Sequence, residues 1–247
     1  SPVMQISVQL YSLREASAVD FDEVLQTLAQ IGYAGVEPFN LFGKTPEAFR
    51  RQVEDLGMQV SSSHYPWSNR TPVNEVVETT QALGLNRAAG GFMPDDFADM
   101  DAINRTIDTT RQLVADLGRH DITLCLHNHY WEYAEVEGQI AYHYVQDAIP
   151  ELEFEIDTYW AANFGIVDPV AAVQRVRARC PLLHIKDGPL QKDASNVAVG
   201  AGSMPIAEVI AAADPAVLEW VIVELDQCDG DMMQAVADSH TYLAKRN

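Results

Sequence analysis

Residues 111–129, RQLVADLGRHDITLCLHNH, contain the pattern that predicts the fold of the whole chain. Leucine and valine recur at helical spacing as far as Leu117, and Gly118 then ends the helical pattern. An apolar run over residues 122–126 follows, which is short enough for a buried strand, and it closes on His127. The segment therefore predicts a helix, a glycine turn, and a strand that ends in a polar side chain able to bind a metal.

The same succession of helix, glycine and strand recurs along the first half of the chain. Gly32, Gly57 and Gly84 occupy the position of Gly118, where glycine adopts the left-handed backbone of a helix C-cap at low cost. The apolar runs give eight predicted strands, at about residues 5–12, 35–39, 59–65, 87–92, 122–129, 152–158, 182–187 and 220–226. Helical patterns lie at about residues 20–31, 45–56, 73–83, 101–119, 139–148, 168–179, 205–213 and 231–245.

Strict alternation of strands and helices implies parallel strands that are joined by right-handed crossovers. A chain of 247 residues has the usual length of an eight-fold α/β barrel, and an open doubly wound sheet is the alternative. No low-complexity segment or linker divides the chain. We therefore predict an α/β protein, a single-domain (β/α)8 TIM barrel over residues 1–247, with helix N-caps at Asp20, Thr45, Asp101 and Asp168.

The composition of the chain restricts its partners. Acidic residues number 36 against 16 basic ones, which gives a formal net charge of −20. Such a balance disfavours nucleic acids and anionic membranes as partners, because both are themselves negatively charged. We therefore expect a small molecule as the ligand, no nucleic acid and no membrane, and the composition allows a homo-oligomer.

The chain carries no sign of export or of membrane insertion. No stretch reaches the roughly 18 uninterrupted apolar residues of a membrane span, and no charged region followed by an apolar run opens the sequence. Cys125, Cys180 and Cys228 have no C-x-x-C spacing and stand in or beside apolar runs, so we expect three reduced thiols. The sequence predicts a cytoplasmic protein.

Four of the predicted strands end in side chains that bind metals. In a TIM barrel the carboxyl ends of the strands form one common face, which carries the active site. Carboxylates and imidazoles are costly to bury unless a partner or a cation satisfies them. Two glutamates, an aspartate and a histidine suit Mn²⁺, Mg²⁺, Co²⁺ or Zn²⁺. The expected ligands are Glu132, Asp157, His184 and Glu224, from the segments LCLHNHYWE (124–132), LEFEIDTYW (152–160), LLHIKDG (182–188) and VIVELD (221–226).

A network of ion pairs across the barrel mouth is the alternative to a metal. The strand ends supply few cations, chiefly Lys186, so such a network would leave several carboxylates uncompensated. In the string H-x-H-x-x-E we favour His129 as a catalytic base. His127 stays open, because it is either a further ligand or a histidine that packs inside the barrel.

Other residues near the strand ends are candidates for substrate binding. Trp131 and Trp160 are the expected walls of a pocket, since aromatic faces stack on the apolar C–H faces of sugars. Lys186, Glu37 and His64 are further candidates, although Glu37 could instead pair with Lys186 inside the barrel. Glycines in the segment VGAGSMP (199–205) are compatible with a phosphate-binding turn or simply with the geometry of a loop.

Several motifs together resemble the xylose isomerase-like TIM barrel superfamily, whose members are often called sugar phosphate isomerases/epimerases. The motifs are GYAGVE (32–37), LHNHYWEY (126–133), FEIDTYW (154–160), LHIKD (183–187) with VGAGSMP (199–205), and IVELD (222–226). The resemblance implies a single divalent metal, for which Mn²⁺ is the leading candidate, held by the four ligands named above. Ketose epimerases of the superfamily usually place a glutamate near the position of His127. The H-x-x-E arrangement of this chain is more similar to the branch of inosose dehydratases and 3-keto-glycoside eliminases or hydratases.

The resemblance implies an enzyme that acts on a keto sugar. A bound dication would acidify the carbon next to the carbonyl, and Glu132, Glu224 or His129 would remove its proton to give an enediolate. A metal-dependent isomerase or epimerase is the leading hypothesis, and a lyase that uses the same site is the alternative. An endonuclease for abasic DNA, which shares this barrel, needs a histidine where Trp160 stands. A non-catalytic sugar-binding barrel is the remaining class.

Overall fold

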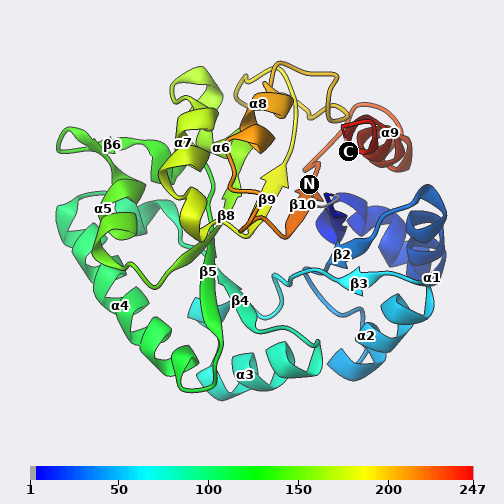
Figure 1. Cartoon of the computed structure of the whole chain (residues 1–247), viewed down its shortest axis with the longest axis horizontal. Coiled ribbons are helices and arrows are strands. Elements are labelled where there is room, and N and C mark those ends of the chain that lie inside the picture. The colour runs from blue at the N-terminus through cyan, green and yellow to red at the C-terminus, as the bar shows by residue number, and fades with distance from the viewer. Residues whose placement is uncertain (1–3, 247) are drawn as a thin grey trace.

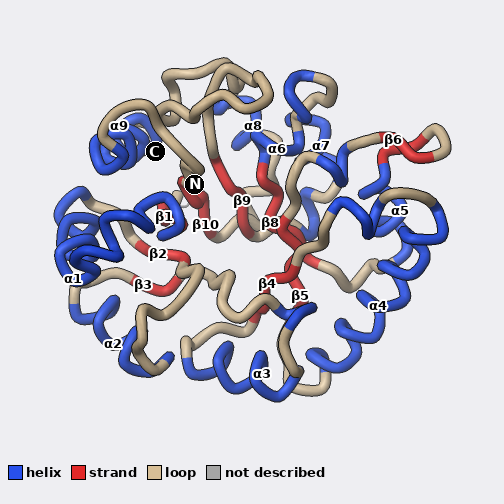
Figure 2. The backbone as a smooth tube through the Cα atoms, turned by 180° about the vertical axis from the view of Figure 1, so that it is seen from behind, coloured by secondary structure: helices blue, strands red, loops and turns tan. Residues whose placement is uncertain are grey.

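The computed structural model describes residues 4–246 and confirms the predicted TIM barrel fold of the α/β class. Eight strands run parallel and curve about a common axis, in the order β3-β2-β1-β10-β9-β8-β5-β4, with helices outside them (Figure 1). Figure 2 gives the view from behind, with the strands gathered inside the ring of helices. The strands are β1 Ile6–Gln9, β2 Gly35–Glu37, β3 Gln59–Val60, β4 Arg87–Gly90, β5 Thr123–His127, β8 Glu153–Asp157, β9 Leu182–Ile185 and β10 Trp220–Val223.

Every helical segment that the sequence predicts overlaps a helix of the structure. The helices are α1 Arg14–Ile31, α2 Pro46–Asp55, α3 Val73–Ala82, α4 Met100–Gly118, α5 Ala141–Ala148, α7 Pro169–Arg175, α8 Ile206–Ala211 and α9 Met232–Ala244. Besides short 3-10 turns, the structure adds the four-residue helix α6, Thr158–Ala161, and the hairpin of β6, Glu135–Val136, and β7, Gln139–Ile140, which were not predicted. No helix within residues 4–246 is both long and apolar enough to cross a membrane.

The helix caps follow the prediction at three positions and differ at one. Thr45 and Asp168 accept hydrogen bonds from backbone amides of α2 and α7, as predicted. Helix α4 is capped by Asp99 and not by Asp101, because Asp99 has the extended backbone that lets its carboxylate reach the amide of Ala102. Helix α1 begins before Asp20 but is kinked there; Asp20 has an extended backbone, and its Oδ1 accepts the backbone N–H of Glu23, so Asp20 caps the part of the helix after the kink, as predicted.

The predicted glycine caps are confirmed at three of four positions. Gly32, Gly57 and Gly84 have positive φ angles, as C-cap glycines do. Gly118 instead remains the last residue of α4, and Asp121, with φ of 58°, makes the left-handed turn before β5. Aspartate tolerates this backbone because its short polar side chain can bond locally.

The barrel interior is built by the alternation of side chains along each strand. Cys125, Leu182, Trp220 and Ile222 form an apolar layer inside the barrel. Residues two and four positions further along the same strands therefore also face the interior. On β8 the inward set includes Asp157, whose register partner on β9 is His184. The apolar layer thus fixes which polar side chains meet above it.

No ladder of backbone hydrogen bonds joins β3 to β4 among the described residues. Side chains of the segment that follows β3 bridge this seam. The indole of Trp67 and the amide of Asn69 both donate to the carbonyl of Gly91, and the Ser68 hydroxyl donates to the carbonyl of Ala89. These bonds hold the two edges of the sheet together.

Candidate metal centre

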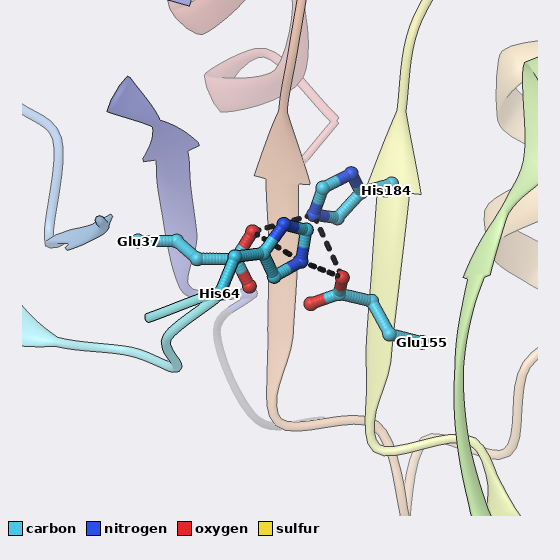
Figure 3. A group of neighbouring side chains, drawn as sticks. All are labelled: Glu37, His64, Glu155 and His184. Carbon is cyan, nitrogen blue, oxygen red and sulfur yellow. Dashed lines mark hydrogen bonds and ion pairs between the residues drawn. The ribbon is translucent and has the colours of Figure 1, made fainter. Parts of the chain in front are cut away.

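Inward-facing side chains at the strand ends form two groups, and His184 belongs to both. In each group the candidate ligand atoms all lie within 4.8 Å of one another. The Asp157 group consists of His127, Asp157, His184 and Glu224. The Glu155 group consists of Glu37, His64, Glu155 and His184 (Figure 3).

In the Glu155 group, imidazole nitrogens and carboxylate oxygens alternate around a ring (Figure 3). His184 Nε2 lies 2.6 Å from Glu37 Oε1 and 3.0 Å from Glu155 Oε1. His64 Nε2 lies 2.6 Å from Glu155 Oε1 and 3.2 Å from Glu37 Oε1. The amide of Gln9 also donates to Glu37.

The charges of the Glu155 group balance. Burial by itself would lower the pKa of the His64 imidazole, but the carboxylates of Glu37 and Glu155 outweigh it and raise that pKa. Burial would also lower the pKa of His184, but the carboxylates of Glu155 and Glu37 again outweigh it and raise that pKa. Two imidazoles that hold protons therefore face two carboxylates. This group satisfies the cost of burying charge without any added cation.

In the Asp157 group, carboxylates surround a single ammonium. Lys186 Nζ lies 3.0 Å from Asp157 Oδ2, 3.0 Å from Glu224 Oε1 and 2.9 Å from Asp226 Oδ2. His184 Nδ1 faces the same carboxylates, 3.3 Å from Glu224 Oε1 and 3.8 Å from Asp157 Oδ2. Burial would lower the pKa of Lys186, but Asp157, Asp226 and Glu224 raise it, so the ammonium keeps its proton.

The Asp157 group carries an excess of negative charge. Three carboxylates face one ammonium, and burial together with neighbouring Glu224 raises the pKa of Asp226. His127 adds no positive charge, because burial lowers its pKa to about 3. Neither ring nitrogen of His127 has a hydrogen-bond partner within residues 4–246, although Nε2 lies 3.4 Å from Asp157 Oδ2. Neutral, buried and unbonded imidazole nitrogens beside uncompensated carboxylates fit a divalent cation.

Asn128 and the small helix α6 hold Asp157 in place. The Asn128 side chain accepts a hydrogen bond from the backbone N–H of Asp157 at 2.9 Å and donates to its carbonyl at 3.1 Å. Asp157 Oδ1 accepts from the backbone N–H of Trp160, which caps α6. One oxygen of Asp157 is thus used within the chain, and Oδ2 is directed to Lys186 and His127.

The structure brings together three of the four ligands that the sequence predicts, namely Asp157, His184 and Glu224. The fourth, Glu132, belongs to neither group. Its Oε2 accepts the backbone N–H of His129 at 2.8 Å, and its Oε1 is buried without a hydrogen-bond partner among the described residues. His127 stands in its place. Strand alternation from Cys125 is the signal that points to His127, since the two residues face the same side.

Glu155 is a site residue that the sequence reasoning missed. It lies two positions before Asp157 on β8, so alternation directs both side chains inward. Glu37 and His64, which the sequence predicts to contact substrate, lie in the Glu155 group. Glu37 also does not pair with Lys186, because its carboxylate is bonded to Gln9, Ser62 and His184. The Glu155 group can therefore orient His184, as carboxylates commonly orient metal-binding histidines.

The predicted base and the predicted aromatic walls lie around the Asp157 group. The His129 ring stacks on Trp131, with centroids 4.2 Å apart, and lies 5.2 Å from the ring of His127. His129 Nδ1 is 3.6 Å from Glu132 Oε2. The ring of Trp160 lies 4.7 Å from Lys186 Nζ, in the geometry of a cation–π contact.

The glycine-containing loop 199–205 folds around the buried side chain of Asp187. Asp187 is fully buried, and its carboxylate accepts hydrogen bonds from the backbone amides of Gly188, Gly200, Gly202 and Met204. A Cβ atom added to Gly202 would lie 2.2 Å from Asp187 Oδ1. These amides are bonded to Asp187, so they do not form a turn that is open to phosphate.

Comparison with known proteins agrees with the fold. A profile of the family described as xylose isomerase-like TIM barrel matches residues 25–245. An inosose dehydratase of Geobacillus kaustophilus is 23% identical over 197 residues, which cover 67% of this chain but 61% of that protein. The chain thus spans less than two thirds of that relative.

Two solved structures illustrate the likeness of fold. A sugar phosphate isomerase/epimerase from Parabacteroides distasonis superposes with a TM-score of 0.81 at 21% identity, covering 99% of this chain and 94% of that one. A D-allulose 3-epimerase from Methylomonas sp. gives 0.71 at 12% identity, covering 99% and 98%. At such identities the likeness concerns the fold alone.

The role of the Glu155 group can be tested by a conservative change. Glu155→Gln removes one of the two carboxylates that hold His184, and we expect the affinity for Mn²⁺ to fall by roughly 10- to 100-fold, the usual effect of losing a partner behind a ligand. Isothermal titration calorimetry measures this affinity. The control is Glu153→Gln on the same strand, where the side chain pairs with Arg87. Unchanged affinity in Glu155→Gln would contradict the orienting role.

Proposed function

Because the chain belongs to the xylose isomerase-like TIM barrel family, we propose that it is a metal-dependent enzyme that isomerises or epimerises a keto sugar. The observation that carries the proposal is the Asp157 group, where buried carboxylates exceed the available positive charge beside a neutral His127. Its position at the carboxyl ends of the strands is the place where TIM barrels hold their active sites.

The residues of the Asp157 group would hold one divalent ion. Two imidazoles and two carboxylates form a mixed donor set, which favours Mn²⁺, Co²⁺ or Zn²⁺ over Mg²⁺, and Mn²⁺ is our leading candidate. When bound, such an ion polarises a substrate carbonyl and stabilises the negative charge that develops on its oxygen. The remaining roles belong to side chains of the chain itself.

His129 and Glu132 are suited to move the proton. His129 lies beside the Asp157 group on a stacked indole, and we assign it as the base that removes the proton next to the substrate carbonyl. Burial raises the pKa of Glu132, so this carboxyl can hold a proton and return it to the substrate. Glu224 is the third candidate base of the sequence analysis. Burial would raise its pKa, but Lys186 and His184 lower it, which suits a ligand better than a base.

Lys186 would bind the substrate. The three N–H groups of its ammonium face Asp157, Glu224 and Asp226. Once Asp157 and Glu224 bind a metal, an N–H that no longer faces them can donate to a sugar oxygen. Trp160 covers the ammonium on one side. The pair would fix the orientation of the sugar ring relative to the base.

A lyase is the second candidate, and the named relative inosose dehydratase favours it. Removal of the proton next to the carbonyl is common to both reactions. If the next carbon carries a hydroxyl or a glycosidic oxygen, a proton donated to that oxygen allows it to leave. A carboxyl with a raised pKa, such as that of Glu132, is suited to this donation.

The two reactions can be separated in one experiment. The Mn²⁺-loaded protein is incubated in D2O with ketoses, an inosose and 3-keto-glucosides, and the products are followed by mass spectrometry and NMR. We expect deuterium at the carbon next to the carbonyl in at least one ketone. A product of unchanged composition apart from deuterium, in which the carbonyl has moved or a carbon is inverted, supports isomerisation or epimerisation, and loss of water or of an alcohol supports the lyase. Absence of exchange in all ketones would contradict the proposal.

The identity of the ligand from the β5 segment can be tested with two variants. His127→Asn removes a direct ligand. We therefore expect it to weaken Mn²⁺ binding by at least roughly 10- to 100-fold, which is the usual effect of losing a partner behind a ligand. Glu132→Gln should bind Mn²⁺ normally and turn over slowly. Calorimetry and steady-state kinetics measure both. The opposite pattern would return Glu132 to the ligand set, as the sequence predicts.

The assignment of His129 predicts a loss of rate without a loss of metal. His129→Ala should slow deuterium exchange by about 10²- to 10⁴-fold, the usual weight of a positioned base, and leave the Mn²⁺ content unchanged. Replacement of the exposed His120 by Ala serves as the control. If the His129 variant loses the ion, then His129 is a ligand.

A further inference from the structure

A small aromatic cavity adjoins the Asp157 group. Its volume is about 160 Å³. The rings of Tyr130, Trp160 and Phe164 line it, together with the loop segment 191–194, and Asp226 lies at its wall. Sites for whole drug-sized ligands measure roughly 300–1,000 Å³, so this cavity has the size for a single ring.

The three aromatic rings form a continuous wall. The ring centroids of Tyr130 and Trp160 lie 5.8 Å apart, those of Tyr130 and Phe164 lie 5.2 Å apart, and those of Trp160 and Phe164 lie 6.0 Å apart. All three residues are only partly buried. Each ring therefore retains surface for a ligand, and apolar walls with a few polar groups are typical of binding sites.

The backbone on both sides of the cavity is strained. Phe164 has a φ angle of 57° and Leu190, next to the facing loop segment, has one of 58°. Side chains other than glycine rarely adopt this left-handed region, and a bulky phenylalanine does so at particular cost. Strain of this kind gathers at ligand-binding sites. Here the left-handed backbone occurs at Phe164, whose ring is one of the three that form the aromatic wall.

Two residues connect the cavity to the metal centre. Trp160 contacts Lys186, whose Nζ lies 4.7 Å from its ring centroid. Asp226 lines the cavity and pairs with the same Lys186 Nζ at 2.9 Å. A ring in the cavity would therefore lie beside the sugar that Lys186 binds.

We propose that this cavity is a subsite for a second pyranose ring, so that the substrate is a keto sugar joined to another sugar. The inference rests on the proposed function and names its substrate class. The apolar C–H face of the ring would stack on the aromatic wall, and its hydroxyls would meet Asp226 and the polar residues of the facing loop.

Two variants test the subsite from opposite directions. Phe164→Ala removes part of the wall, and Ala194→Phe places a ring into the cavity from the facing loop. Ile166→Ala is the control, because Ile166 is exposed, lies in the same segment as Phe164 and does not line this cavity. Exchange of the α-proton is measured for a free 3-keto-hexose and for the same keto sugar within a disaccharide.

We expect both cavity variants to lower kcat/KM for the disaccharide by roughly 10-fold or more, mainly through KM, as for the loss of contacts in an apolar specificity pocket. Values for the free sugar and for the control should stay unchanged. Equal losses on both substrates, or no loss on either, would overturn the subsite.

A binding experiment separates this inference from the proposed reaction. The metal-free protein is titrated calorimetrically with cellobiose, maltose and glucose, which need no turnover. Binding of a disaccharide in preference to glucose, lost in Phe164→Ala and in Ala194→Phe, supports the subsite even if no exchange is found with any ketone. Equal affinity for glucose and both disaccharides, or equal binding by wild type and both variants, refutes it even if the enzyme proves active on free ketoses.

Discussion

The imidazole of His184 links the two polar groups of the barrel, and the arrangement of the site depends on it. Its Nε2 faces the carboxylates of Glu37 and Glu155, and its Nδ1 faces Glu224 and Asp157. Binding of a cation at Nδ1 would displace the proton from that nitrogen and leave the proton on Nε2 between the two carboxylates. In the proposed metal site, the Glu155 group would thus orient the His184 ligand of the Asp157 group.

The buried acidic residues differ in how their negative charge is compensated. Glu37 and Glu155 face two imidazoles, and Asp187 is surrounded by the backbone amides of its loop. Asp157, by contrast, shares a single ammonium with Glu224 and Asp226. A buried carboxylate without sufficient compensation is costly, which is the physical reason for proposing a divalent cation at this group.

The same centre is compatible with an isomerase and with a lyase, because both begin with removal of a proton next to a carbonyl. Selection of the substrate depends on residues away from the ligands. The aromatic wall of Tyr130, Trp160 and Phe164 borders the centre through Lys186, and no strand alternation specifies it. It is formed by the loops that follow β5 and β8, which are the parts of a TIM barrel that vary with function.

The sequence by itself determined the barrel and the convergence of Asp157, His184 and Glu224, because the periods of helices and strands are local and alternation fixes which side chains face inward. Only the tertiary structure decided that His127 joins these residues in place of Glu132. Glu132 lies beyond the strand, in the turn Trp131–Tyr133, and the path of that turn is set by packing. The contacts of Glu37 and His64 with the Glu155 group likewise depend on the tertiary structure. These residues are distant in sequence, and buried charged groups are stable only when the fold places a partner beside them.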